Sequence, residues 1–237
     1  MSLLLIDVYS DFCCPWCYVG ERRLLSAVES FAAESGRRIE LTFHPYMIDP
    51  RIHKDGEEYM DYCRKRWGGD GRTSGLKQEG RQDGCAFGGW KVWANTLNAH
   101  MLVDFAQRQH QRQMKEAQDT QTPEQIAALK EAHQQRLVRL VDLLFTRAYE
   151  EGKNISLPAE LDTVAAELGD IDASEFRKHL SDPTAVASVK EEDAEAKGGL
   201  SIRGVPYFIV RESGKTPVAL SGAQPKQAFL ELFKKMR

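Results

Sequence analysis

The two cysteines of Cys14-Pro-Trp-Cys17 have the clearest chemical potential in the 237-residue sequence. They lie between a run of strand-forming residues, Leu3 to Tyr9, and a segment with helical periodicity that starts near Tyr18. A sulfur at the start of a helix lies beside unpaired N–H groups and the positive end of the helix dipole, which favour a thiolate. Because the thiolate is the nucleophile in thiol–disulfide exchange, we expect Cys14 to attack a disulfide.

The spacing of the motif gives the second cysteine a complementary role. Cys17 falls one helical turn beyond Cys14, close enough to attack a mixed disulfide and resolve it. Pro15 suits the first turn, because its missing N–H would have no partner there and its φ angle is already helical. Two such thiols beside a strand–helix–strand unit are typical of a redox site.

The alternative for this pair is half of a structural zinc site. The remaining cysteines, Cys13, Cys63 and Cys85, offer no second close pair of ligands, so no metal is expected. Cys13 is most simply a small buried residue, although its place next to Cys14 leaves metal binding or oxidation open. Cys63 and Cys85 are either isolated or a second redox pair, depending on their separation.

A second candidate element is Gly204-Val-Pro-Tyr207. Proline cannot donate to a strand ladder, so it is tolerated at the start of a strand but not in its interior. A cis bond between Val205 and Pro206 would turn the Val205 backbone towards a neighbouring loop, where it could pair with a peptide or thiol substrate. An ordinary turn proline is the simpler alternative. The presence of the Cys14–Cys17 pair favours the substrate-binding interpretation.

The elements that must position these residues occur at both ends of the chain. Leu3–Tyr9 and Arg38–Phe43 are expected strands joined by a helix, which implies parallel pairing through a right-handed crossover. Val205–Val210 and Val218–Leu220 form an expected antiparallel hairpin, followed by a helix over Gln224–Lys234. Neither end has enough strands for a covered sheet, so we expect the two to combine.

The segment between these ends has mostly helical periodicity. Expected helices are Met101–Gln118, a long one after a capping box at Thr122, Pro158–Leu168, Ser174–Leu180 and Pro183–Lys197. Gly68–Gly89, with eight glycines in 22 residues, is expected to be a mobile loop near the site. We therefore predict an α/β protein in which residues 1–48 and 199–237 form one domain, and residues 49–198 are an inserted all-helical domain.

Composition limits the classes of partner and location. The 32 Lys and Arg residues against 35 Asp and Glu give a net charge of −3, so neither nucleic acid nor an anionic membrane is an expected partner. No apolar run approaches the roughly 18–20 residues of a membrane span, and the opening residues lack the pattern of a secretory signal. Five cysteines are too few, and odd in number, for a disulfide-stapled secreted fold. A cytoplasmic location is expected, with an organelle left open.

Several stretches together resemble a known family. They are Ser10–Gly20, Asn95–His100, Ala148–Gly152, Gly204–Phe208 and Ser221–Pro225, in the family's order along nearly the whole chain. The sequence is similar to the DsbA-like branch of the thioredoxin superfamily, specifically the FrnE-type dithiol–disulfide oxidoreductases. These are related to 2-hydroxychromene-2-carboxylate isomerase and to kappa-class glutathione transferases. The resemblance implies a thioredoxin fold interrupted by a helical domain, a nucleophilic Cys14, a resolving Cys17 and a cis Pro206.

Departures from the family pattern refine this expectation. The isomerase and transferase relatives have a serine at the position of Cys14, so the resemblance favours redox chemistry. Trp16 lies where some strongly oxidising relatives have a histidine, and without that cation a milder oxidant is expected. Cys13 and the long polar helix with its restart at Thr122 are not part of the pattern, which leaves the choice of partner open.

The resemblance also nominates residues around the cysteines. It places His100 at the start of a helix that faces the active site, where it touches substrate or orders an interdomain surface. Ser221 and Gly222, before the last helix, either bind a carboxylate such as that of glutathione or cap the helix. The expected substrate-binding residues are Pro15, Trp16, His100, Val205, Ser221 and Gly222.

These residues predict a protein disulfide oxidoreductase or isomerase that acts on protein or small-molecule disulfides, in a direction that the sequence does not set. One alternative is a glutathione-dependent isomerase or transferase, in which Cys14 stabilises a glutathione thiolate and Cys17 is dispensable. A second is a non-enzymatic binding protein or holdase, which slow alkylation of Cys14 at neutral pH would favour. No tightly bound cofactor is expected. Glutathione is a candidate co-substrate, and a homodimer is consistent with the family.

Overall fold

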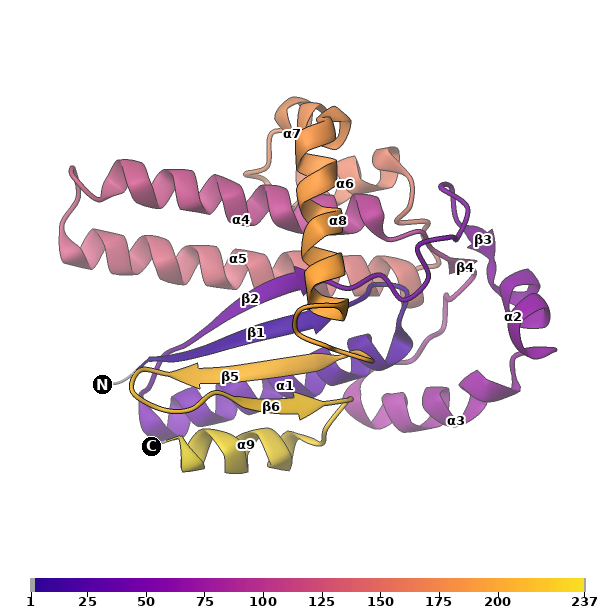
Figure 1. Cartoon of the computed structure of the whole chain (residues 1–237), viewed down its shortest axis with the longest axis horizontal. Coiled ribbons are helices and arrows are strands. Elements are labelled where there is room, and N and C mark those ends of the chain that lie inside the picture. The colour runs from indigo at the N-terminus through magenta and orange to yellow at the C-terminus, as the bar shows by residue number, and fades with distance from the viewer. Residues whose placement is uncertain (1–2, 237) are drawn as a thin grey trace.

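A computed structural model describes residues 3–236, so residues 1, 2 and 237 of the predicted domain lie outside the described part. A four-stranded sheet lies in the middle of the molecule, with helices on both sides (Figure 1). Its strands are β1 (Leu4–Ser10), β2 (Ile39–Pro45), β5 (Tyr207–Glu212) and β6 (Val218–Ser221), in the spatial order β2-β1-β5-β6. The two ends of the chain therefore combine into one sheet, as the sequence predicts.

The pairing within this sheet is that of a thioredoxin fold. β1 is parallel to β2 and antiparallel to β5, and β5 and β6 form an antiparallel hairpin. The crossover from β1 to β2 is α1 (Pro15–Ser35), which ends at Gly36 with a left-handed φ of 65°. After β6 the chain continues into α9 (Lys226–Lys235).

Side chains alternate between the two faces of the sheet and determine what covers each. Val8 of β1 belongs to the main core together with α1 and α9. There Phe31 of α1 meets Phe233 of α9 with ring centroids 5.4 Å apart. Tyr9, the next residue, packs on the opposite face in a smaller cluster with Ala196. The main core thus lies on the side of the sheet that carries α1.

The segment between β2 and β5 contains the remaining helices. They are α2 (Tyr59–Trp67), α3 (Gly71–Gly80), α4 (Leu97–Ala117), α5 (Pro123–Tyr149), α6 (Pro158–Leu168), α7 (Ala173–Ser181) and α8 (Pro183–Lys197). The predicted capping box is present, since Thr122 and Gln125 exchange hydrogen bonds at the start of α5. No helix in residues 3–236 has the length and apolar character that crossing a membrane requires.

The insert also contains a two-stranded ribbon that the sequence does not predict. Its strands are β3 (Glu57–Glu58) and β4 (Val92–Trp93), which pair antiparallel. Strands of two residues are too short to leave an alternating pattern in the sequence. The insert of the thioredoxin fold is therefore helical except for this ribbon.

The glycine-rich segment differs from its prediction as a loop. Residues 71–83 form α3 and a short 3-10 helix, η1 (Arg81–Asp83). A Cβ at Gly80 would lie 2.6 Å from the Phe87 ring and 3.2 Å from a methyl group of Val19, so α3 packs closely against α1 at this point. Tertiary packing outweighs the low helix propensity of glycine here.

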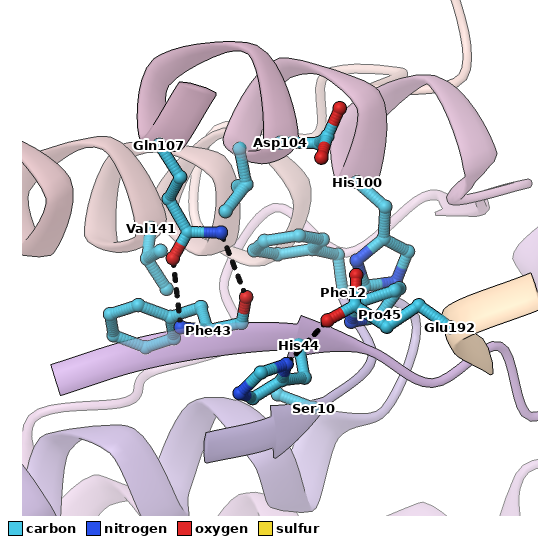
Figure 2. Close-up of a pocket in the computed structure, with 11 residues that line it drawn as sticks. Ser10, Phe12, Phe43, His44, Pro45, His100, Asp104, Gln107, Val141 and Glu192 are labelled. Carbon is cyan, nitrogen blue, oxygen red and sulfur yellow. Dashed lines mark hydrogen bonds and ion pairs between the residues drawn. The ribbon is translucent and has the colours of Figure 1, made fainter. Parts of the chain in front are cut away.

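Glutamine side chains from α4 and α5 complete the hydrogen bonding of the edge strand β2. Gln107 accepts from the N–H of Phe43 and donates to its carbonyl oxygen, both at 3.1 Å (Figure 2). Gln134 accepts from the N–H of Leu41 at 2.9 Å. Such bonds cover an edge that could otherwise pair with another chain. The polar face of α4 thus has a structural role beside the sheet.

An ion-pair cluster attaches α8 to the sheet. His44 of β2 places Nδ1 2.5 Å from the Glu192 carboxylate and Nε2 3.3 Å from that of Asp7. Burial alone would lower the pKa of His44, but the two carboxylates outweigh it and raise the pKa to about 9. Figure 2 shows this imidazole below the α4 helix, beside Glu192. His44 therefore joins two strands and α8 through charge.

Candidate active site

Cys14 is the N-cap residue at the junction of β1 and α1. Its backbone is extended, with φ −94° and ψ 109°, and Pro15 begins the helix. The Cys14 carbonyl accepts the first-turn N–H of Cys17 at 2.9 Å. The first turn carries no acidic side chain. Cys14 therefore lies at the helix N-terminus, beside its first-turn N–H groups and the positive end of its dipole, and its side chain makes no capping hydrogen bond to them.

The two sulfurs of the motif lie in different environments. Cys14 is 8% exposed, whereas Cys17 is 1% exposed. Burial, followed by contact with the Cys14 thiol, raises the pKa of Cys17 well above its ordinary value. The N–H of Asp11 donates to Cys17 Sγ at 3.4 Å. Cys14 is thus the outer, slightly exposed thiol of the pair, and Cys17 is the inner, protonated one.

Pro206 lies against the same site. The Val205–Pro206 peptide bond is cis, as the resemblance implies. Cys14 Sγ lies 3.8 Å from the carbonyl oxygen of Val205, although the two residues are 191 positions apart. Gly20 of α1 makes this approach possible, because a Cβ there would lie 2.7 Å from Cγ of Pro206. The fold thus brings the two sequence elements with the strongest signals into contact.

Four of the predicted residues share a groove beside this contact. Trp16, Val205, Pro206 and Gly222 line it together with Glu79 and Ala223, and its volume is about 370 Å³. Trp16 is 37% exposed, so its ring is accessible to a bound molecule. Pro15 is buried at the start of the helix and is absent from this lining. Cys14 does not line the groove itself, but its sulfur contacts the carbonyl of Val205, which does.

Ser221 and Gly222 do not occupy the predicted position at the mouth of a helix. The N-cap of α9 is Pro225, so helix capping by Ser221 and Gly222 is a wrong prediction. Gly222 uses its N–H to donate to the Pro206 carbonyl at 2.8 Å. Ser221 is the last residue of β6, and its carbonyl accepts from Gln224 at 2.6 Å. Gly222 thus holds the proline loop, which the sequence could not reveal because both atoms of this bond belong to the main chain.

His100 lies behind the active-site loop and outside the groove. It is 5% exposed, and its ring centroid is 5.0 Å from that of Phe12. The neighbouring cavity, shown in Figure 2, has a volume of only about 10 Å³, too small for a substrate. Nε2 of His100 lies 3.6 Å from the Asp11 carboxylate. Of the two expected roles of His100, this interior contact supports the ordering of the loop, and its contact with substrate stays a prediction.

Asp11 organises the site, although the sequence pattern does not single it out. Its carboxylate is fully buried and accepts from the Ile48 N–H at 2.6 Å and the Thr96 hydroxyl at 2.7 Å. Burial opposes its ionisation, but the contacts of His100, Ile48 and Thr96 outweigh burial and hold the pKa of Asp11 below its ordinary value. One charge thus connects the cysteine loop to the segment after β2 and to the N-cap of α4. An aspartate before a cysteine pair was the only available signal.

Cys13 is turned into the interior and is tied to this carboxylate. Its thiol donates to Asp11 at 3.1 Å, and the residue is 4% exposed. Burial and the negative charge of Asp11 raise the pKa of Cys13 well above its ordinary value. The thiol is therefore neutral and inaccessible, as expected for a small buried residue. No group of three or more metal-ligating side chains comes together anywhere in residues 3–236.

Cys63 and Cys85 are free thiols in the interior. Burial raises the pKa of Cys63, and it raises that of Cys85 to about 12. Both are therefore poor nucleophiles at neutral pH compared with an accessible thiolate.

The geometry can be compared with proteins already known. The family model of the DSBA-like thioredoxin domain matches residues 5–234. A probable DsbA oxidoreductase from Streptomyces coelicolor superimposes with a TM-score of 0.71, at 22% identity, over 98% of this chain and 89% of the other. 2-Hydroxychromene-2-carboxylate isomerase gives a TM-score of 0.61 at 17% identity, over 98% and 94% of the two chains.

A third similar structure is the cytosolic disulfide reductase DsbM from Pseudomonas aeruginosa. Its TM-score is 0.59 at 18% identity, over 98% of this chain and 100% of the other. No protein among those with curated functions matches the sequence. At these identities the likeness between structures shows a shared fold.

Proposed function

The chain belongs to the DSBA-like thioredoxin domain family, and from this premise we propose that it is a thiol–disulfide oxidoreductase with Cys14 as nucleophile and Cys17 as resolving thiol. The observation that carries the proposal is the contact between Cys14 Sγ and the Val205 carbonyl, 3.8 Å apart at the edge of an open groove. It puts the outer thiol of the pair beside backbone that a substrate can reach.

The reaction proceeds by two exchanges. The Cys14 thiolate attacks one sulfur of a substrate disulfide, forms a mixed disulfide and releases the other sulfur as a thiolate. Cys17 then loses its proton and attacks Cys14 Sγ, which forms the Cys14–Cys17 disulfide and releases the second substrate thiol. The substrate disulfide gains two electrons and the cysteine pair loses them. The same two steps in reverse donate a disulfide to the substrate, and the reduction potential of the partner relative to that of the cysteine pair sets the direction.

The relatives support a thiol or disulfide as the substrate class. DsbM is a cytosolic disulfide reductase, and one structure of it, with a TM-score of 0.56 and 19% identity to this chain, contains GSH. Glutathione is accordingly a candidate co-substrate here, with no tightly bound cofactor. The cytosolic location of that relative likewise supports a cytoplasmic location for this protein.

A glutathione-dependent isomerase is the second candidate, because an isomerase is among the similar structures. The two functions make opposite demands on the inner thiol. Redox exchange needs Cys17 to resolve the mixed disulfide, whereas isomerisation needs a single activated thiol. Cys17 lies in contact with Cys14 and is nearly fully buried, which favours the redox function.

The test is to replace Cys17 by serine and to mix the reduced protein with bis(2-hydroxyethyl) disulfide. The proposal predicts that Cys17→Ser accumulates the hydroxyethyl adduct on Cys14, detected by mass spectrometry, whereas the wild-type protein passes on to an internal disulfide. Cys63→Ala removes a buried thiol elsewhere and should behave as wild type. Failure of Cys14 to react in either form would overturn the proposal, and isomerase activity that survives Cys17→Ser would favour the second candidate.

A further inference from the structure

Within residues 3–236, the lining of the groove beside Cys14 carries negative charge and no positive charge. Glu79 is the one charged residue among the described residues that line it, and it comes from α3 of the insert. Its side chain is 49% exposed. The other lining residues are Trp16, Val205, Pro206, Gly222 and Ala223. A molecule that reaches Cys14 through the groove therefore meets a carboxylate.

Arg23 of α1 fixes the position of this carboxylate. Its guanidinium lies 2.9 Å from Glu79 and 2.8 Å from Asp83, and it donates to the Ala223 carbonyl at 2.7 Å. Two carboxylates share one guanidinium, so the cluster keeps a net charge of −1. Arg23 is 11% exposed, whereas Glu79 is 49% exposed. The negative partner is thus the one presented to the groove.

The close packing of α3 on α1 explains why Glu79 reaches the active-site surface. Gly80, the next residue, allows α3 to approach Val19, since a Cβ there would lie only 3.2 Å from the Val19 methyl group. Val19 follows the cysteine motif by two residues. The insert thereby contributes a side chain to a site that is otherwise built by the two ends of the chain.

The remaining chemistry of the groove also suits a cation. Trp16 presents an accessible indole ring, and aromatic faces attract ammonium and guanidinium groups. The N–H of Gly222, one of the groups considered for carboxylate binding, donates instead to the Pro206 carbonyl. A carboxylate and an aromatic ring favour a positive group, and nothing among the described lining residues is positively charged.

We propose that Glu79 is a specificity-determining residue that makes the protein prefer disulfides with a positive group next to the reacting sulfur over disulfides with a negative one. The substrate class is an aminoalkyl disulfide or a cysteine flanked by lysine or arginine. This inference rests on the proposed thiol–disulfide exchange. The chemistry is the same for every substrate: the disulfide is reduced to two thiols as Cys14 and Cys17 become a disulfide.

The experiment uses three small disulfides of similar size and different charge. Pre-reduced protein, freed of reductant, is mixed at low ionic strength with cystamine, bis(2-hydroxyethyl) disulfide or 3,3′-dithiodipropionate. The second-order rate constant is obtained from the time course of the loss of free protein thiols. The wild-type protein should react faster with cystamine than with dithiodipropionate, after division by the rate constants of each disulfide with a small free thiol.

Removing the charge should reduce this preference. Glu79→Gln is expected to lower the ratio of the cystamine rate constant to the dithiodipropionate rate constant by roughly fivefold to tenfold. In a water-like dielectric the Glu79 charge attracts the ammonium group and repels the carboxylate over several ångströms, and the two effects multiply in the ratio. Glu79→Lys should invert the preference, and added salt should weaken it. The matched control is Glu34→Gln, which removes an exposed carboxylate paired with Lys234 at the far end of α1.

The outcomes separate the inference from the function on which it rests. An unchanged ratio in Glu79→Gln, with normal reaction of the neutral disulfide, overturns the role of Glu79 and leaves the oxidoreductase proposal standing. Absence of reaction between the wild-type dithiol and the neutral disulfide overturns both. A ratio that falls equally in Glu34→Gln would attribute the preference to the overall charge of the protein and would also overturn the inference.

Discussion

Asp11 puts a fully buried carboxylate three residues before the nucleophile. The Ile48 N–H, the Thr96 hydroxyl and the Cys13 thiol all donate to it. A buried charge is costly unless such partners satisfy it, and removing the charge leaves the donors without an equivalent acceptor. The contacts hold the cysteine loop against segments that lie far away in the sequence. Asp11 is therefore a positioning residue for the site.

Replacement of Asp11 by asparagine should destabilise the protein by about 1–3 kcal/mol at pH 7. The amide nitrogen that replaces one carboxylate oxygen is a hydrogen-bond donor, and it would face groups that are donors themselves. The pKa of Asp11 is lowered on folding, so its contribution is present above the unfolded value of about 3.8 and is lost as the pH falls through the lower folded value. The stability gap between wild type and Asp11→Asn in urea should thus narrow below pH 3.8.

The control for this experiment is Asp119→Asn, at an exposed turn position, which should leave stability nearly unchanged. A gap for Asp11→Asn that stays constant from pH 7 down to pH 3 would show that the ionised carboxylate contributes nothing specific.

The sequence reveals single residues only where their chemistry is local. Cys14 and Cys17 can be recognised in the sequence by their spacing, and Pro206 by its place at the start of an expected strand. Glu79 depends on Arg23, 56 positions away, and nothing in its own neighbourhood distinguishes it from other surface carboxylates. Asp11 is similar, since its contact with Thr96 spans 85 positions. Such residues become visible only when distant segments meet.

At the scale of elements, α1 and its N-cap residue carry the two cysteines, and α1 also carries the glycine against which the proline loop packs. Gly20 lies one turn beyond Cys17, and the Pro206 ring occupies the space that a side chain would fill. The parallel pairing of β1 with β2 and the hairpin of β5 with β6 were predictable from alternation and turn residues. The α3 helix was not, because its glycines favour a loop and only its packing on α1 stabilises the helix.

Replacing Gly20 by alanine tests this contact. The added methyl group would lie 2.7 Å from Pro206 Cγ and should displace the loop at a cost of about 1–3 kcal/mol. The rate of disulfide exchange at Cys14 should fall by about tenfold, because even a small displacement of the reacting groups slows a reaction strongly. Stopped-flow reaction of the reduced protein with bis(2-hydroxyethyl) disulfide measures the effect.

Gly204→Ala is the matched control, since a Cβ at Gly204 meets no atom within 4 Å although it lies in the same loop. Equal rates for Gly20→Ala and the wild-type protein would contradict the role assigned to this contact.

At the scale of the whole molecule, the insert and the thioredoxin fold share one hydrophobic core. Phe12 and Phe145 have ring centroids 5.0 Å apart, and Tyr18 and Tyr149 stack at 5.6 Å, which joins the cysteine loop and α1 to α5. These residues all belong to the same cluster. The boundaries after residue 48 and before residue 199 remain predictions based on the change in periodicity, and the sequence carries no sign of how tightly the two parts pack.

A shared core predicts cooperative unfolding of the described chain. Differential scanning calorimetry of the reduced protein should give one transition, with a calorimetric enthalpy close to the van't Hoff enthalpy. Two resolved transitions would mean that the insert is energetically separate from the sheet, contrary to the packing of α5 on α1.

The central claim is that Cys14 and Cys17 form a two-electron couple while the other thiols remain buried and inert. A redox titration in glutathione buffers, with mass mapping of all five cysteines at each potential, measures this directly. The account predicts one transition in which a Cys14–Cys17 disulfide appears and Cys13, Cys63 and Cys85 stay reduced. Absence of that disulfide at every potential, or pairing of Cys14 with another cysteine instead, would contradict it.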